Sequence, residues 1–218
     1  MTIVVFTAAA SEPLTIPEVM AHCRIDVNND DSLLPILISS ARAAAEQQLH
    51  RYLITQTLDA YFDGFPRYSC NNQRYYTDGY PSFLTDGQSH SNYLILLPPL
   101  QSVTSISYVD DNGATQTLAA DQYLVDSKST PARITPAYGV SWPTTRIQNG
   151  AVIVRFVAGY GTASSVPACV KNWMLIRIKT LYENRDQITV GTNGLVMIPS
   201  EFIDSLLDSE RVYGAMFA

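Results

Sequence analysis

Chemically reactive side chains are scarce in this sequence, and the few present are scattered. The three cysteines and three histidines are Cys23, Cys70, Cys169, His22, His50 and His90. No Cys-x-x-Cys pair occurs and no two histidines have metal-ligand spacing, so neither a zinc site nor a disulfide framework is indicated. Thiols kept reduced in a cytoplasm fit this usage best, and we interpret Cys23 and Cys169 as buried small hydrophobes in helices.

Motifs of known catalytic and nucleotide-binding sites are also missing. The sequence has no Gly-x-Ser-x-Gly, no Walker A loop and no His-Glu-x-x-His. Gly159-Tyr160-Gly161 lies between a predicted strand and a predicted helix, but it lacks the third glycine of a phosphate loop. The pairs Asp30-Asp31 and Asp110-Asp111 fit a helix cap and a hairpin turn better than carboxylate chemistry. We therefore predict no catalytic, cofactor-binding or metal-binding residues, and no enzyme activity.

Positive charge and long apolar runs are the remaining deficits. The chain has 14 Lys and Arg against 20 Asp and Glu, a net charge of −6 and a pI of about 4.9. Such a chain does not bind nucleic acid over its whole surface, although a local basic patch is compatible with this composition. No apolar run is long enough to cross a membrane. The apolar run Ile3 to Phe6 is short and follows no basic residue, so we expect an extended lead segment rather than a signal peptide.

Helical patterns occur near both ends of the chain. Thr15 and Glu18 have capping-box spacing, which predicts a short helix to about Arg24. A second helix is predicted from Asp31, with Pro35 in its first turn and apolar residues at helical spacing: Leu34, Leu37, Ile38, Ala41, Ala45, Leu49 and Tyr52. Small side chains there permit the close approach of a neighbouring helix.

A third helix is predicted from Pro167 to Arg185. It is apolar on more than one side, so we expect it to be sandwiched, either inside the fold or against another subunit. A last short helix is expected from residue 199 through Leu207. No partner can be assigned to the apolar tail from Arg211 to Ala218.

The middle of the chain favours β-strands. Short apolar stretches bounded by turn residues predict six or seven strands at 54–62, 93–97, 103–109, 114–118, 123–125, 132–134 and 151–157. Asn112-Gly113 is a strong hairpin signal. Residues 67–92 are polar with scattered aromatics and are expected to form a long surface loop. Its aromatic residues are equally compatible with a carbohydrate or partner surface and with packing on their own lobe: Tyr75, Tyr76, Tyr80 and Phe83.

The expected fold class is α+β, with an inserted antiparallel β-barrel or sandwich. We divide the chain into a lead segment with helices (1–53), a β-rich lobe (54–161) and C-terminal helices with a tail (162–218). The two helical parts are expected to pack together as a small bundle. Four arginines near helix ends or on helix faces fit a solvated face and a ring of subunit contacts about equally well: Arg24, Arg42, Arg51 and Arg185.

Several short motifs, in their order and spacing, resemble phage head-tail connector (adaptor) proteins over most of the chain. In the N-terminal part they are Pro13-Leu14-Thr15, residues 21–26, 30–34, 41–46, 51–57 and 63–66. Further along they are residues 97–103, 108–110, 156–161, 166–168 and Leu181-Tyr182-Glu183-Asn184-Arg185. The long segment 67–92 and Cys23, in place of an aliphatic residue, depart from the family pattern.

The resemblance implies a structural protein of the virion neck, made in the host cytoplasm before assembly. It implies a ring, dodecameric in the virion, beneath the portal protein, which extends the DNA channel and docks head-closure or tail proteins. Candidate subunit or portal contacts are Ala41, Arg42, Ala45, Arg51, Arg185, Tyr213 and Phe217. The alternatives are another neck protein, such as a stopper or tail terminator, or a glycan-binding virion module.

Overall fold

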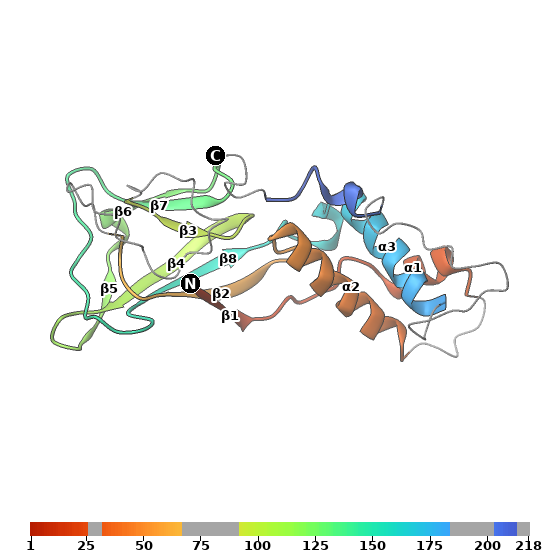
Figure 1. Ribbon diagram of the computed structural model, residues 1–218, viewed down its shortest axis with the longest axis horizontal. Helices are drawn as coiled ribbons and strands as arrows, with labels where there is room; N and C mark the ends of the chain where they lie inside the picture. Colours follow the sequence, from red (N-terminus) through yellow and green to blue (C-terminus); the bar gives the residue numbers. More distant parts are fainter. Residues whose placement is uncertain (26–31, 67–91, 184–202, 213–218) are drawn as a thin grey trace, which may run out of the picture. The chain divides into compact units, whose positions relative to one another are not determined.

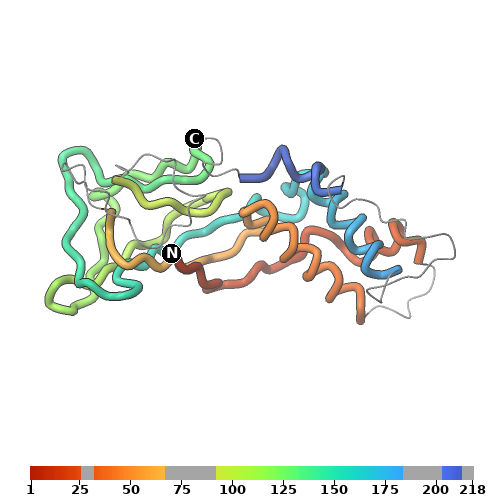
Figure 2. The backbone as a smooth tube through the Cα atoms, viewed as in Figure 1, coloured from red at the N-terminus to blue at the C-terminus, as the bar shows by residue number. Residues whose placement is uncertain are grey.

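The computed structural model describes residues 1–25, 32–66, 92–183 and 203–212, and the chain folds into two compact units (Figures 1 and 2). In the described residues, the β unit contains Met1–Ala8, the strands within Thr55–Gly159, and Val212. The helical unit contains Ala9–Ile54 and Tyr160–Arg211. Residues 1–8, grouped with the helices in the sequence analysis, therefore lie with the strands.

The described part of the helical unit has three α-helices and two short 3-10 helices. They are α1 (Ile16–Cys23), α2 (Leu34–Leu49), η4 (Ala163–Ser165), α3 (Ala168–Glu183) and η5 (Ser205–Leu207). Thus α1, α2 and α3 confirm the three longer helices predicted from periodicity, while η5 covers the end of the expected last helix.

The capping box of α1 forms as predicted. The Glu18 N–H donates to Thr15 Oγ1 at 3.4 Å, and the Thr15 N–H donates to Glu18 Oε2 at 2.7 Å. Arg24 ends the helix in the left-handed conformation, with φ of 58°. Because both termini satisfy backbone groups locally, the boundaries of α1 are readable from its sequence alone.

The start of α2 differs from the prediction. The helix begins at Leu34 rather than Asp31, and Leu33 at the N-cap makes no side-chain capping bond. The expected cap, residues 28–31, lies outside the described residues. Pro35 occupies the first turn, as predicted, where a missing N–H costs no helical hydrogen bond.

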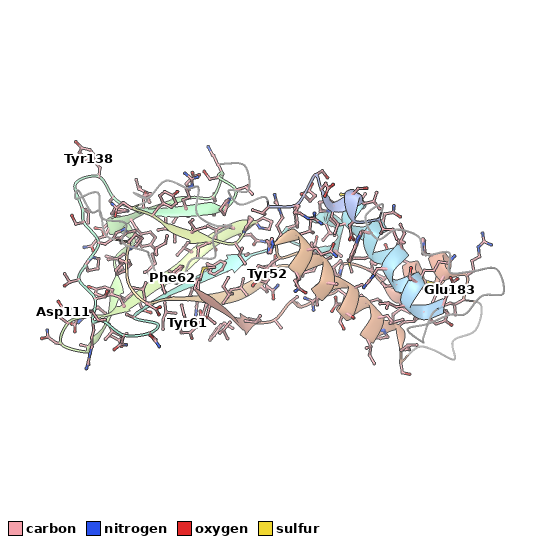
Figure 3. All side chains as sticks on the ribbon, in the orientation of Figure 1. Tyr52, Tyr61, Phe62, Asp111, Tyr138 and Glu183 are labelled. Carbon is pink, nitrogen blue, oxygen red and sulfur yellow. The ribbon has the colours of Figure 1, made fainter. Side chains whose placement is uncertain are left out.

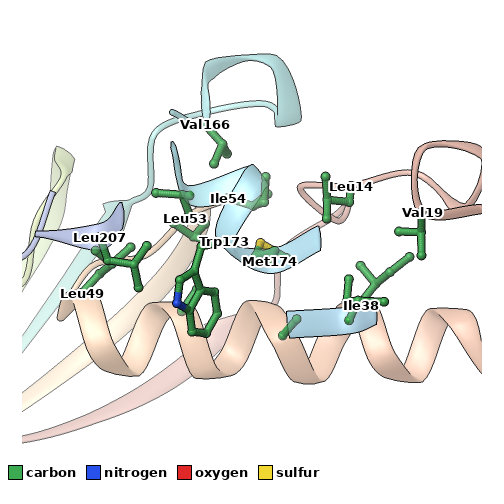
Figure 4. Close-up of a cluster of buried hydrophobic side chains, with 14 of the residues drawn as sticks. Leu14, Val19, Ile38, Leu49, Leu53, Ile54, Val166, Trp173, Met174 and Leu207 are labelled. Atoms are coloured by element: carbon green, nitrogen blue, oxygen red, sulfur yellow. The ribbon is translucent and has the colours of Figure 1, made fainter. Parts of the chain in front are cut away.

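The core of the helical unit lies where α3 packs on α2 (Figure 4). From α3 it takes Val170, Trp173, Met174 and Ile178, and from α2 it takes Leu34, Ile38, Ala41, Ala45 and Leu49. The Trp173 indole N–H donates to Asp204 Oδ1 at 2.9 Å, so the ring is buried without an unpaired polar atom. Leu175 and Tyr182 pack on the same core, so much of the apolar surface of α3 is covered inside the fold.

The strands of the β unit form two antiparallel sheets in the described part of the chain. The first has the order β1-β2-β8-β4-β5 and the second the order β3-β7-β6. The strands are β1 (Thr2–Thr7), β2 (Gln56–Phe62), β3 (Leu94–Leu96), β4 (Leu100–Val109), β5 (Thr115–Leu118), β6 (Tyr123–Asp126), β7 (Ala132–Pro136) and β8 (Val152–Ala158). The predicted antiparallel β lobe is confirmed, and the expected lead segment is an edge strand, β1.

Alternation along β8 explains its central place in the larger sheet. Val152, Val154, Phe156 and Ala158 are buried, while the residues between them are half-buried. Its neighbours β2 and β4 pair with it antiparallel along its length. A strand that is covered on one face and partly covered on the other belongs inside a sheet rather than at an edge.

The predicted hairpin turn joins β4 to β5. Asp110 Oδ1 accepts from the N–H groups of Asn112 and Ala114, both at 2.9 Å. Gly113 has φ of 86°, which a side chain would rarely adopt. Hydrogen bonds from the Ala114 N–H, then from the Gln116 side chain and the other turn N–H groups, lower the pKa of Asp110. These bonds are the structural role of the Asp110 carboxylate.

Replacing Ala45 with glutamate is expected to destabilise the helical unit by more than about 2 kcal/mol, because the site is filled and apolar. The matched control is Ala43→Glu. Ala43 is exposed on another face of α2, so this substitution should change stability by less than about 0.5 kcal/mol. Urea unfolding followed by Trp173 fluorescence, in a Trp142→Phe background, measures both variants. Equal losses from the two substitutions would contradict this placement of the core.

Candidate assembly surfaces

Ala41 and Ala45, predicted as subunit contacts, are 1% and 0% exposed. The close helix approach that their small side chains permit is made with α3 of the same chain. Neither residue offers surface to a second subunit, so both are core residues of the helical unit. Sequence periodicity identified the buried stripe of α2 but could not say which helix covers it.

Arg42, the second candidate on α2, is paired within its own chain. Its Nε lies 2.7 Å from Glu12 Oε2, its Nη2 donates to Glu12 Oε1 at 3.3 Å, and its Nη1 lies 3.5 Å from Glu46 Oε2. The forked contact with Glu12 ties the segment before α1 to the middle of α2. Arg42 therefore stabilises the helical unit through ion pairs within the chain. The sequence analysis had considered only a solvated face and a subunit contact for it.

Glu46 extends this network past the end of α2. Its Oε1 accepts the Leu53 N–H at 3.0 Å, in the segment that follows the helix. Burial raises the pKa of Glu46, against the opposing effects of the Leu53 N–H and of Arg42. Burial, together with the charge of Glu46, also raises the pKa of Tyr52 to about 12.

Arg51 belongs to a second cluster, also within the helical unit. Its guanidinium carbon lies 5.9 Å from the centre of the Tyr160 ring. The Tyr160 hydroxyl donates to Glu210 Oε2 at 2.7 Å, and burial followed by this bond raises the tyrosine pKa. Arg211 in turn bonds through its N–H to the Leu207 carbonyl at 3.0 Å and through its side chain to Asp208 at 3.3 Å. The chain is therefore held firmly up to Arg211.

The remaining candidates lie outside the described residues. These are Arg185, Tyr213 and Phe217, with most of the long polar segment 67–92. Their predicted contacts stay predictions. Arg24 is described, and it forms the exposed C-cap of α1.

The β unit exposes apolar residues of the run Ile3 to Phe6, which the sequence analysis interpreted only as an extended lead segment. On β1, Val4 and Val5 are each 49% exposed and Phe6 is 58% exposed. The signal was present in the run Ile3 to Phe6, but an apolar run alone does not say whether a strand is central or lies at an edge.

Phe6 is fixed by a neighbouring ion pair. Arg155 on β8 donates from Nε and Nη2 to the two carboxylate oxygens of Asp59 on β2, each at 2.7 Å. The Arg155 guanidinium carbon lies 3.6 Å from the centre of the Phe6 ring, in a cation–π contact. The contact orders the end of β1, whose pairing with β2 shifts register between Val5 and Thr7.

Two loop residues of the β unit are almost fully exposed. Tyr138 (Figure 3) is 102% exposed and Ile147 is 98% exposed, both between β7 and β8. Large apolar side chains in that position gain nothing from folding and are candidates for contact with another protein.

The described residues show no arrangement that suggests chemistry. His22 lies in the last turn of α1 and His50 forms the C-cap of α2. Within the described ranges, no three His, Cys, Asp or Glu side chains gather as metal ligands. No helix in the described part of the chain is long and apolar enough to span a membrane.

Substitutions at Glu46 test its network. Its folded pKa is raised, so its contribution to stability is present below pH of about 4.5 and is lost as pH rises through the folded pKa. Glu46→Gln keeps an oxygen acceptor without the charge, so its stability relative to wild type should improve between pH 4 and pH 7. Glu46→Ala shares this pH trend but also leaves the Leu53 N–H unpaired, so it should be about 1–2 kcal/mol less stable than Glu46→Gln at every pH.

Urea unfolding across that pH range compares the two variants. A glutamine variant that instead loses relative stability as pH rises would show that attraction to Arg42, not burial, dominates at this site.

Comparisons with known proteins agree with the resemblance seen in the sequence. Residues 13–75 match the family model described as phage gp6-like head-tail connector protein. A comparison with curated protein sequences finds no match.

Three solved structures are similar to this chain over nearly its whole length. A chain from the neck of an empty gene transfer agent particle, computed with C6 symmetry, matches with a TM-score of 0.67 and 20% identity. A chain from the virion of the native particle matches at 0.68 and 19%, and one from its neck, computed with C12 symmetry, at 0.60 and 21%. Each match covers 97% of this chain and 96% of the other.

At these identities the structural matches establish the fold. The family match covers α1, α2 and β2 in the described residues, together with the start of the segment 67–92. The predicted family resemblance is thus confirmed: residues 13–75 match the gp6-like head-tail connector family, and the chain has the fold of chains from gene transfer agent particles.

Proposed function

We propose that this chain is a head-tail connector, a structural protein of the virion neck of a tailed phage or related particle. Copies form a ring beneath the portal, extend the DNA channel and dock a head-closure or tail protein. The main support for this proposal is that 97% of the chain shares its fold with chains from gene transfer agent particles, two of them from the neck. The family match at residues 13–75 supports the same role independently.

The acidic balance of the chain suits a passage for DNA. With a net charge of −6, the chain has little tendency to hold the duplex by counterion release, so DNA moves past it without tight binding. The role needs no catalysis, in keeping with a family of structural connectors. The host cytoplasm before assembly and the neck of the virion afterwards are the proposed locations.

Ring contacts need surfaces that folding has left open. The helical unit buries much of its apolar surface in its own core, and Arg42 and Arg51 contact residues of the same chain. Arg185, Tyr213 and Phe217 remain the proposed contacts to the portal or an adjacent subunit. A cyclic ring joins two different surfaces on each copy, which is the requirement of a heterologous interface.

Negative-stain electron microscopy of the purified protein, alone and with its portal protein, tests the proposal. We expect closed rings, with 12 copies as the expected number because one similar neck structure was computed with C12 symmetry. The ring can also require the portal as a template, so both samples are examined. Particles that stay monomeric at high concentration and with the portal would contradict the connector role.

Tyr138→Ser and Ile147→Ser test whether the exposed loop residues dock a neck or tail protein. Both side chains are almost fully exposed, so unfolding free energy should change by less than about 0.5 kcal/mol. Rings should form normally, while particles that carry the double variant should join tails less often. If the double variant joins tails at the wild-type level, the loop between β7 and β8 does not dock the neck or tail protein.

A further inference from the structure

The strand β1 ends one side of the larger sheet without the features that usually protect an edge. Its sequence, Thr2–Thr7, contains no charge and no proline, and its single irregularity is the register shift near Phe6. Edge strands present unpaired backbone N–H and C=O groups, which pair readily with another chain unless lysine, proline or cover prevents it. From Thr2 to Val5, β1 pairs regularly with β2, so its backbone is already set for a further strand.

The other three edge strands of the described sheets are different. β3 is buried along its length, β5 has the polar sequence TQTL, and β6 ends in Asp126. Among these four edge strands, only β1 is both uncharged and rich in exposed apolar side chains. Val4, Val5 and Phe6 are each about half exposed. The edge of β1 is therefore the one best suited to accept a strand.

A strand that fits this edge must be extended, uncharged and free of proline. Val4 and Val5 point to opposite faces of the sheet and are equally exposed, so the added strand should carry apolar side chains on both faces. Pairing through backbone hydrogen bonds, with side chains giving specificity, is a common way to bind a peptide segment.

The end of this chain has those properties. Residues 213–218, Tyr-Gly-Ala-Met-Phe-Ala, contain no charge and no proline. Six extended residues span about 20 Å, the length of a six-residue strand such as β1. The segment follows Glu210 and Arg211, which are held to the helical unit by the contacts described above, so it leaves from a fixed point.

We propose that residues 213–218 of one copy add as a strand to the outer edge of β1 in the next copy. The inference rests on the proposed ring, because a donor tail and a separate acceptor edge on every copy provide the two different surfaces that a closed ring requires. Tyr213 and Phe217 then act as apolar anchors against β1 rather than against the portal. Folding leaves Val4 and Val5 half-exposed, and apolar side chains of the added strand lie beside them on the two faces of the sheet.

Photo-cross-linking of the full-length protein tests the pairing. A benzoylphenylalanine replaces Phe217, and these copies are mixed with isotope-labelled copies before irradiation, so that cross-links between copies are distinguished by mass. We expect adducts between position 217 of one copy and residues 2–7 of another. Val5→Lys in the labelled copies should reduce the adducts at least about fivefold, because lysine blocks edge pairing.

Two control variants accompany the experiment. Leu124→Lys places the same charge on the exposed edge strand β6 and should leave the adducts unchanged. Val5→Thr keeps a β-branched residue without a charge and should retain them. Ring formation is counted in the same samples by electron microscopy.

Each outcome has one meaning for the inference. Adducts between copies that map to β1 and respond to Val5→Lys support it. Adducts within one copy, adducts to other residues or no adducts overturn it. Rings seen without adducts at β1 leave the connector proposal standing, whereas adducts at β1 without rings support strand exchange but count against the connector role.

Discussion

The packing of Trp173 in the core that α3 forms with α2 is the contact on which the helical unit depends. Residues 9–54 and 160–211 are separated in sequence by Thr55–Gly159, yet they share one core. Ala41 and Ala45 leave room for the two helices to approach closely, and Asp204 satisfies the indole N–H. The core thus joins the segments before and after the β insert into one unit.

Polar contacts then fix the segments around this core. Arg42 holds Glu12 before α1, Glu46 holds the Leu53 backbone after α2, and Tyr160 holds Glu210 near the end of the chain. The contacts of Arg42 and Tyr160 join segments 30 and 50 residues apart, whereas the Glu46 contact spans 7 residues at the end of α2. Arg42, which the sequence suggests as a contact to another subunit, is thus already paired within its own chain. The exposed apolar residues of the β unit are therefore the better candidates for assembly contacts.

Local signals account for what could be predicted. The capping box at Thr15, the hairpin turn at Asn112-Gly113 and the alternation along β8 act over a few residues, so their structures follow from neighbouring side chains. The start of α2 was misplaced because acidic residues before a helix suggest a cap, whereas here Leu33 takes that position. The motifs of a connector also lie in such short stretches, which is why the family could be recognised without a structure.

The sequence by itself determined the helices, most strands, the α+β class and the family resemblance, because these depend on periodicity, turn chemistry and short motifs. Only the tertiary structure decided that Thr2–Thr7 is the edge of a sheet, that Ala41 and Ala45 face α3 of the same chain, and that Arg42 is bound by Glu12 and Glu46. The physical reason is that a side chain's exposure and its partners are set by residues far away in sequence. An apolar stripe shows that a surface must be covered, but not which surface covers it.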